Sequence, residues 1–181
     1  MTPISIGELK KAIKRGEPFE FIPFYVSVFS NWYPAIFEED GIIYPTSEHY
    51  MMAKKAELFE DSFILKQILD TENPGVAKVL GRHVSNFNIK IWRKHRFDIV
   101  AQGAALKFVQ NHELKLELQA TKGKILVEAS PVDRIWGVGL DKSDKKVHDP
   151  FEWRGKNLLG FALIRARQLI RSTTWRSKNL K

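Results

Sequence analysis

Residues 88–111, NIKIWRKHRFDIVAQGAALKFVQN, carry an uninterrupted helical periodicity. Trp92, Ile99, Gly103 and Leu106 recur along this stretch at three- and four-residue steps, which places them on one face of a helix. We therefore expect a long helix here, and a stretch of this kind indicates a mainly helical fold.

Shorter helices are expected on both sides, because residues typical of helix N-termini recur along the chain. Ser5 followed by Glu8 forms a capping box, and Thr46 or Ser47 can cap a helix that has Glu48 in its first turn. The expected helices are 6–15, 47–58, 62–69 after Asp61, one opened by Asn73-Pro74, 112–120 and 157–170.

Extended segments complete the expected secondary structure. Pro23 lies inside an aromatic and β-branched run, which favours an edge strand, and Glu39-Asp40-Gly41 predicts the turn of a hairpin. The segments expected to be strands, hairpin or loop are 19–28, 34–44 (the hairpin), 124–129 and the loop 136–150. The predicted fold class is α+β: a single compact, mainly helical domain with a small β-hairpin or sheet.

Length and composition limit the classes of protein that the chain can form. Its 181 residues fit one domain, and 44% of them are hydrophobic, enough for a core. We expect an N-terminal helix over 1–18, the main domain over 19–171 and a basic tail over 172–181. The absence of cysteine excludes disulfides, a thiolate nucleophile and a cysteine-ligated zinc site. No stretch reads as a signal peptide or a membrane span, so we expect a soluble, cytoplasmic protein that does not contact a membrane.

The net charge of +8 is unevenly distributed along the chain. Half of it lies in the last eleven residues, where Arg171, Arg176, Lys178 and Lys181 occur without an acid. With Trp175 among them, this tail could hold phosphates and stack on a base, or it could be a frayed and solvated end. The charge permits a nucleic-acid partner without requiring one.

Four short segments contain residues that are poor choices for simple packing: Phe29–Pro34, Tyr44–Ala56, Asp133–Leu140, and Gly155–Gly160 followed by Arg165. In the second segment, Glu48 and Lys55 are seven residues apart, so they share one helix face about 10 Å apart, with Met52 between them. A carboxylate and an ammonium so placed can bracket a sugar. A capping glutamate and a solvated lysine would explain the same residues.

The third segment combines a carboxylate, an aromatic ring and two glycines. Gly137 and Gly139 flank Val138 directly after Trp136, which lets the backbone approach a ligand closely while the indole offers a flat apolar face. Asp133 supplies the carboxylate. The other interpretation is a tight turn covered by a core tryptophan.

In this order, the segments resemble the NADAR family, whose bacterial representatives include the YbiA-like proteins. The resemblance covers about residues 25–170 and rests on Phe29-Ser30-Asn31, Pro45-Thr46-Ser47-Glu48-His49-Tyr50 with Lys55, Asn73-Pro74 with Gly81-Arg82, Trp136-Gly137, and Asn157 with Leu159-Gly160. The chain departs from the YbiA-like pattern in the sequence Gly-Val-Gly-Leu after Trp136, in the charged insert 141–150 and in the basic tail.

The resemblance implies N-glycosidase chemistry on ribosylated nitrogen compounds. The leading substrate is ADP-ribose attached to guanine in nucleic acid, with an ADP-ribosyltransferase toxin as the partner that would attach it. The alternative is a phosphoribosylated intermediate of riboflavin synthesis, which the departures from the YbiA-like pattern put in doubt. A third interpretation is a non-catalytic ADP-ribose or NAD-binding module, and the joint presence of Glu48, Lys55 and Asp133 argues against it.

Cleavage of a ribosyl C–N bond develops positive charge at the anomeric carbon and negative charge on the leaving nitrogen. We expect Glu48 to act as general acid/base or ion-stabilising carboxylate, and Asp133 to activate water or bind ribose hydroxyls. Lys55 could attack C1 of the opened sugar as a neutral amine, or clamp a phosphate as a charged group.

The remaining site residues are expected to bind the substrate by hydrogen bonds, stacking or close backbone approach. They are Ser30, Asn31, Trp32, Tyr50, Arg82, Trp136, Gly137, Gly139, Asn157 and Gly160. Arg82 and Arg165 could bind phosphate or form structural ion pairs. No cofactor and no metal are expected, because the five histidines show no i,i+4 ligand pair.

Overall fold

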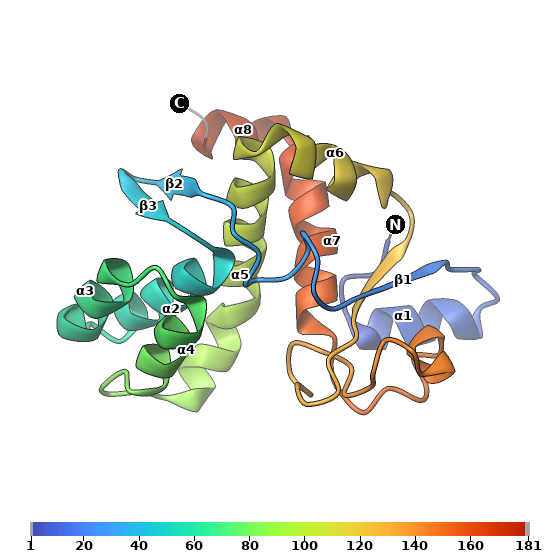
Figure 1. The fold of residues 1–181 in the computed structure, drawn as a ribbon. Helices are drawn as coiled ribbons and strands as arrows, with labels where there is room; N and C mark the ends of the chain where they lie inside the picture. The colour runs from blue at the N-terminus through green and yellow to red at the C-terminus, as the bar shows by residue number, and fades with distance from the viewer. Residues whose placement is uncertain (1, 180–181) are drawn as a thin grey trace. The chain divides into compact units, whose positions relative to one another are not determined.

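The computed structural model describes residues 2–179 of the chain, which form two compact units (Figure 1). The central unit is Asn31–Asn111, and the terminal unit joins Met1–Ser30 to His112–Lys181. Helices outweigh strands in both units, which confirms the predicted α+β, mainly helical fold class. Among the described residues, no helix has the length and apolarity that crossing a membrane requires.

The central unit combines a β-hairpin with a group of helices. Its elements are β2 (Phe37–Glu39), β3 (Ile42–Tyr44), α2 (Ser47–Leu58), α3 (Ser62–Asp70), α4 (Pro74–Arg82) and α5 (Ile89–Gln110). The strands pair antiparallel with Phe37 opposite Tyr44, and Asp40 and Gly41 form the predicted turn with positive φ angles. α2 contacts α3, α4 and α5, and Figure 1 shows these helices grouped together.

The terminal unit is built around a short parallel sheet and the helix α7. Its elements are α1 (Ile6–Lys14), β1 (Phe21–Phe24), α6 (His112–Ala120), β4 (Ile125–Glu128), the 3₁₀-helix η1 (Lys145–His148), α7 (Leu158–Arg171) and α8 (Thr173–Asn179). β1 pairs with β4 in parallel, with Phe21 opposite Ile125. All four residues of β4 are buried, and α7 packs against this strand.

Side-chain caps begin the helices where the sequence predicted them. Oγ1 of Thr46 accepts a hydrogen bond from the backbone N–H of His49, which decides between Thr46 and Ser47 as the cap of α2. The side chains of Asp61 and Asn73 accept in the same way in the first turns of α3 and α4. A cap of this kind typically contributes about 1 kcal/mol to helix stability.

Burial of α2 places polar side chains in the interior of the central unit. Nine of the twelve residues of this helix are buried. A Cβ added at Gly81 of α4 would overlap the side chain of Met52, and one added at Gly103 of α5 would overlap the ring of Tyr50. These two glycines therefore let α4 and α5 approach α2 closely.

Two expectations from the sequence need correction. The stretch 136–150, expected as an irregular loop, contains η1, whose first turn is capped by Asp144. The segment after Arg171, for which a frayed end was one interpretation, forms α8 as far as Asn179. Trp175 is the reason, because its side chain is only 8% exposed and such burial favours an ordered helix. Residues 180 and 181 lie outside the described part of the chain.

Candidate functional site

Polar groups on α2 form the first part of the candidate site. Glu48 is 3% exposed, and its backbone N–H donates a 2.9 Å hydrogen bond to the carbonyl of Asn31. Asn31, 7% exposed, is thereby held beside the start of α2. Two residues of the Ser30-Asn31-Trp32 and Thr46–Tyr50 segments thus meet in the central unit, as expected for parts of one site.

Lys55 is buried on α2, which makes the interpretation as a solvated lysine wrong. Its side chain is 8% exposed, and Nζ donates a 2.6 Å hydrogen bond to the carbonyl oxygen of Gly81. The same nitrogen lies 4.1 Å from the ring centroid of Phe87 and 5.8 Å from that of Trp92. Burial lowers the pKa of Lys55, because removal from water disfavours the charged ammonium.

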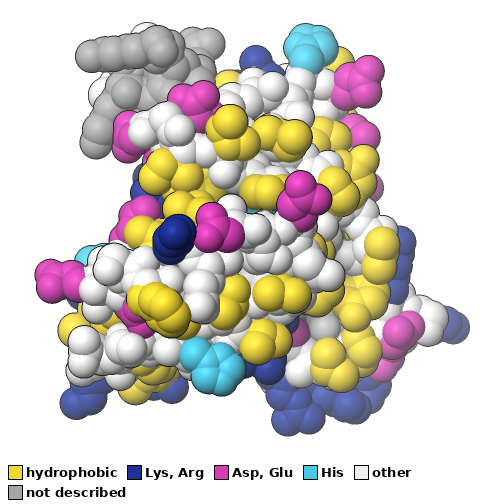
Figure 2. Space-filling view, turned by 60° about the vertical axis from the view of Figure 1, so that its left-hand side comes forward, with side chains coloured by type: hydrophobic (Ala, Val, Ile, Leu, Met, Phe, Trp, Pro, Cys, Tyr) yellow, Lys and Arg dark blue, Asp and Glu magenta, His cyan; other side chains and the backbone are white. Residues whose placement is uncertain are grey.

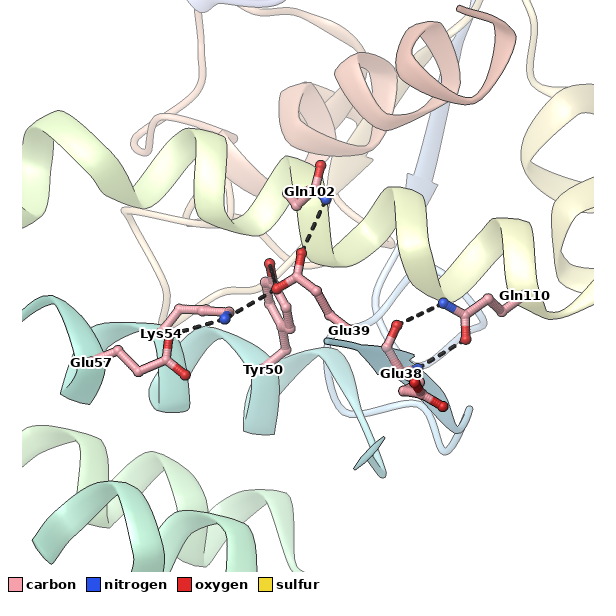
Figure 3. Close-up of polar contacts among 7 residues, drawn as sticks. All are labelled: Glu38, Glu39, Tyr50, Lys54, Glu57, Gln102 and Gln110. Atoms are coloured by element: carbon pink, nitrogen blue, oxygen red, sulfur yellow. Dashed lines mark hydrogen bonds and ion pairs between the residues drawn. The ribbon is translucent and has the colours of Figure 1, made fainter. Parts of the chain in front are cut away.

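The neighbouring Lys54 belongs to a different environment, a network of charged and polar groups around Glu39 (Figure 3). The Lys54 ammonium lies 3.1 Å from the Glu39 carboxylate and 2.9 Å from that of Glu57. Burial alone would lower the pKa of Lys54, but the hydrogen bonds to Glu57 and Glu39 outweigh it, so the pKa is raised. Of the two adjacent lysines, therefore, only Lys55 has a pKa shifted towards a neutral amine.

Tyr50 joins the same network, and its place disfavours the expected stacking role. Its hydroxyl donates a 3.0 Å hydrogen bond to Glu39, and Nε2 of Gln102 donates to the other oxygen of that carboxylate at 3.1 Å. The Tyr50 ring is 2% exposed and lies 5.0 Å from the ring centroid of Tyr44. Tyr50 therefore offers no open face to a ligand in this structure.

Asp133 organises the second part of the candidate site, in the terminal unit. Its Oδ1 accepts hydrogen bonds from the backbone N–H groups of Ile135 at 2.7 Å and Trp136 at 2.8 Å. Its own N–H donates to Oγ of Ser130 at 3.2 Å. One carboxylate oxygen of Asp133 thus shapes the turn that carries Trp136, a structural role in addition to the binding or water-activating role expected from the sequence.

The glycines of this turn are required by close backbone approach. A Cβ at Gly137 would lie 2.8 Å from the carbonyl oxygen of Asp133, and one at Gly155 would overlap the carbonyl oxygen of Gly137. Gly139 has a φ of 72°, a left-handed conformation that glycine adopts without strain. The side chain of Trp136 at the head of this turn is half-buried, so part of the ring is accessible.

Asn157 and Gly160 hold the turn to the sheet, a structural role beside the substrate-binding role that the sequence predicted for them. Its Oδ1 accepts from the backbone N–H of Glu128 at 2.9 Å, and its Nδ2 donates to the carbonyl of Leu126 at 2.8 Å. Asn157 is fully buried with a φ of 53°, just before α7. A Cβ at Gly160 would overlap the Leu126 carbonyl oxygen, so glycine there serves packing.

The remaining expected residues lie at or near the surface. Trp32 is 46% exposed and lies beside Gly75, with Nζ of Lys78 5.6 Å from its ring centroid. Arg82 is exposed at the last residue of α4, Ser30 is half-buried, and Arg165 bonds Gln168 at 3.4 Å. The central unit holds Asn31, Trp32, Glu48, Tyr50, Lys55 and Arg82; the terminal unit holds Ser30, Asp133, Trp136, Gly137, Gly139, Asn157 and Gly160.

Lys107 and His49 are two further buried basic groups of the central unit to which the sequence had assigned no role. Lys107 is 1% exposed, its Nζ lies 5.4 Å from the ring centroid of Tyr33, and burial lowers its pKa to about 7. His49 is fully buried, a 2.8 Å hydrogen bond joins its Nδ1 to Oγ1 of Thr46, and burial lowers its pKa. The helical repeat contained the signal for Lys107, which follows Gly103 by four residues and so shares its inward face.

In the part of the chain that the structure describes, no three His, Asp or Glu side chains gather around one point. The two units do contain buried carboxylates, desolvated lysines and a glycine turn with an aromatic ring.

Comparison with known proteins identifies the family. The NADAR domain matches residues 23–171, which include both the α2 segment and the glycine turn. The chain belongs to the NADAR family. It is 45% identical over 148 residues to an N-glycosidase of Acanthamoeba polyphaga mimivirus, covering 79% of this chain and 87% of the relative. The N-glycosidase YbiA of Escherichia coli is 33% identical over 142 residues, covering 78% of this chain and 80% of that protein.

A solved structure supports the NADAR assignment. The NMR structure of the E. coli protein YbiA resembles this chain with a TM-score of 0.67 and 32% identity, covering 82% of this chain and 83% of the YbiA chain. The resemblance to the NADAR family that the sequence motifs indicated is therefore confirmed.

Proposed function

We propose that this NADAR protein hydrolyses the bond between ribose C1 and the base nitrogen of ADP-ribosylated guanine in nucleic acid. The coarser part, hydrolysis of an N-glycosyl bond, follows from the family and from relatives that are N-glycosidases. The observation that carries the chemistry is the burial of Lys55, with its lowered pKa, on the same helix as the buried carboxylate of Glu48.

Glu48 acts on the charge that develops as the glycosidic bond breaks. A carboxylate with 3% exposure is poorly screened by water, so it stabilises a cationic anomeric carbon more strongly than an exposed one would. Asp133 is the second carboxylate in this proposal. One of its oxygens holds the turn, and the other is the atom that would orient water or a ribose hydroxyl.

Lys55 supports two routes. In the covalent route its neutral amine bonds to C1, the base leaves, and an imine forms; the two amine protons end on the ring oxygen and on the leaving nitrogen, and water then releases the sugar. In the direct route water attacks C1, and Lys55 stays charged as a partner of phosphate or sugar. The lowered pKa of Lys55, which follows from its burial, favours the covalent route.

The choice of substrate rests on charge. The protein carries a net charge of +8, and Arg134, Arg154 and Lys156 are exposed around the glycine turn. A polyanionic substrate fits this distribution better than a small phosphoribosyl compound, which offers only one phosphate.

Two substrates tested side by side decide the proposal. An oligonucleotide with one ADP-ribosylated guanine and a phosphoribosylated amino-pyrimidine of riboflavin synthesis are incubated with wild type and with Glu48→Gln, and released sugar is quantified by mass spectrometry. We expect release from the oligonucleotide by wild type and at least about 100-fold less by the variant. Turnover of the pyrimidine alone would make the riboflavin function correct, and turnover of neither would contradict both.

A further inference from the structure

Three cationic side chains project from the backbone around the turn that contains Gly137 and Gly139 in the terminal unit. The N–H of Lys156 donates to the carbonyl of Arg134 at 3.0 Å, and the N–H of Arg154 donates to the carbonyl of Val138 at 2.9 Å. A Cβ built at Gly139 would lie 3.1 Å from Cβ of Arg154 and 3.2 Å from Cγ of Arg134. The fold therefore brings Arg134, Arg154 and Lys156 together from segments about twenty residues apart.

All three side chains are exposed, and none of them forms an ion pair with another described residue. Acidic side chains of the same segments have other partners and do not neutralise these cations. The Asp133 carboxylate accepts a hydrogen bond from the backbone N–H of Ile135 in the turn, and the Glu152 carboxylate lies 3.4 Å from the ammonium of Lys146. We call Arg134, Arg154 and Lys156 the cationic rim. In the face drawn in Figure 2, the largest group of Lys and Arg side chains lies at the lower edge, and others lie singly elsewhere on that face.

An exposed aromatic ring lies in the segment that leads into the rim. Phe151 precedes Arg154 by three residues and is 45% exposed. The ammonium groups of Lys10 and Lys14, on α1, lie 5.3 and 5.9 Å from its ring centroid. Asp149 fixes the backbone at this point, because its Oδ1 accepts from the N–H of Phe151 at 2.9 Å. Cations interleaved with an aromatic ring are typical of surfaces that bind single-stranded nucleic acid.

We infer that the cationic rim binds the sugar-phosphate backbone of a single-stranded nucleic acid, and that Phe151 stacks on one of its bases. The inference rests on the proposed function, since it identifies the surface that carries the strand flanking the modified guanine. Three neighbouring cations suit successive phosphates of one strand, whereas a lone phosphate would need only one or two of them. The turn between them holds Trp136, which places the rim next to a candidate substrate-binding ring.

Binding of an unmodified, fluorescein-labelled single-stranded DNA, followed by anisotropy over a range of salt concentrations, tests this inference without any hydrolysis. The test variant is Arg134→Gln/Arg154→Gln/Lys156→Gln. The matched control is Lys66→Gln/Lys90→Gln/Arg93→Gln, which removes the same formal charge from exposed positions of the central unit. A second test variant, Arg134→Lys/Arg154→Lys, keeps the charge, and circular dichroism checks that every variant is folded.

We expect the rim variant to bind at least about tenfold more weakly, and its salt slope to fall by about 2, since each contact to a single strand contributes about 0.7. The control and the lysine variant should stay within about threefold of wild type. An equal loss in rim variant and control would mean that only net charge matters, and absence of wild-type binding would exclude a nucleic-acid partner; either result overturns the inference. If the rim variant does not fold, Arg134→Gln and Arg154→Gln are measured singly, with the same expectation at about one third of the slope change.

The outcome is separable from that of the proposed function. Rim-dependent DNA binding without release of ADP-ribose would leave this inference standing and contradict the proposed reaction. If wild type releases ADP-ribose from a modified oligonucleotide and the rim variant binds that oligonucleotide as well as wild type does, the proposed reaction stands and this inference is contradicted.

Discussion

The ammonium of Lys55 and the carbonyl oxygen of Gly81 are 2.6 Å apart, so a lysine at the end of α2 is anchored to the last turn of α4. Met52, one turn earlier on α2, fills the space that the absent side chain of Gly81 leaves. The hydrogen bond holds Nζ near the rings of Phe87 and Trp92, and the side chain is only 8% exposed. Desolvation, which lowers the pKa of Lys55, is thus a consequence of helix packing.

Glu48→Gln should fold and bind substrate but lose turnover. Glutamine keeps the size of the side chain and removes the negative charge that stabilises the anomeric cation. We expect a loss in kcat of about 100-fold or more, with a dissociation constant for ADP-ribose within a few-fold of wild type. Single-turnover kinetics and calorimetric titration measure the two quantities. A variant with a rate close to that of wild type would remove Glu48 from the mechanism.

Gly160→Ala should destabilise the terminal unit, since the new Cβ would overlap the carbonyl oxygen of Leu126 in β4. Overpacking of this kind typically costs about 1–3 kcal/mol.

Asn157→Ala should also destabilise the terminal unit, because it leaves the Glu128 N–H and the Leu126 carbonyl without their buried partners, at about 1–3 kcal/mol each. Thermal and urea denaturation measure both. Gly7→Ala, where an added Cβ meets nothing, is the control; because Gly7 lies in α1, the variant should be as stable as wild type or more stable by up to about 1 kcal/mol.

Local sequence patterns predicted most helices and the residues at which they begin. They did not predict features that depend on contacts between residues far apart in the sequence. Thr46, Asp61 and Asn73 act within one turn of their own positions, so their caps could be read from the sequence. The parallel pairing of β1 with β4 joins residues about a hundred positions apart, and no local pattern encodes it. Asn157 is a residue type that often binds ligands, so the sequence predicted a binding role for it. In the structure its side-chain amide forms hydrogen bonds with the backbone of β4, and only the fold brings these groups together.

The two lysines of α2 show the same limit for the site. Lys54 and Lys55 are adjacent in the sequence and equally basic as free residues. Their difference comes from Glu39 and Glu57 on one side, and from Gly81 and its aromatic neighbours on the other. The pairing of Glu48 with Lys55 at seven residues was predictable from helix geometry, whereas the burial of Lys55 was not.

Lys107 should make stability depend on pH. Its folded-state pKa of about 7 lies below the ordinary value of 10.5, so the unfolded chain binds more protons between these two values. The contribution of Lys107 to the free energy of unfolding therefore rises with pH across this window, by at most about 1.4 kcal/mol per unit. Below pH 7 its contribution no longer varies. Urea denaturation from pH 6 to 10 should show that Lys107→Met lacks this part of the rise, and parallel curves would contradict the assignment.

Borohydride trapping separates the two routes at Lys55. In the covalent route the amine must be neutral to attack C1, so kcat/KM should rise with pH through the lowered pKa of Lys55, and the imine can be reduced to a stable adduct. Intact-mass spectrometry of an active reaction with cyanoborohydride should then show one sugar-sized increase, and peptide mapping should place it on Lys55. Lys55→Arg keeps the charge but cannot form the bond, so it should be inactive and unlabelled. Lys54→Arg is the matched control: it can keep the contacts with Glu39 and Glu57, and it should retain both the adduct and turnover. Substantial turnover in Lys55→Arg with no adduct in wild type would leave Lys55 a binding residue and make direct attack by water the route.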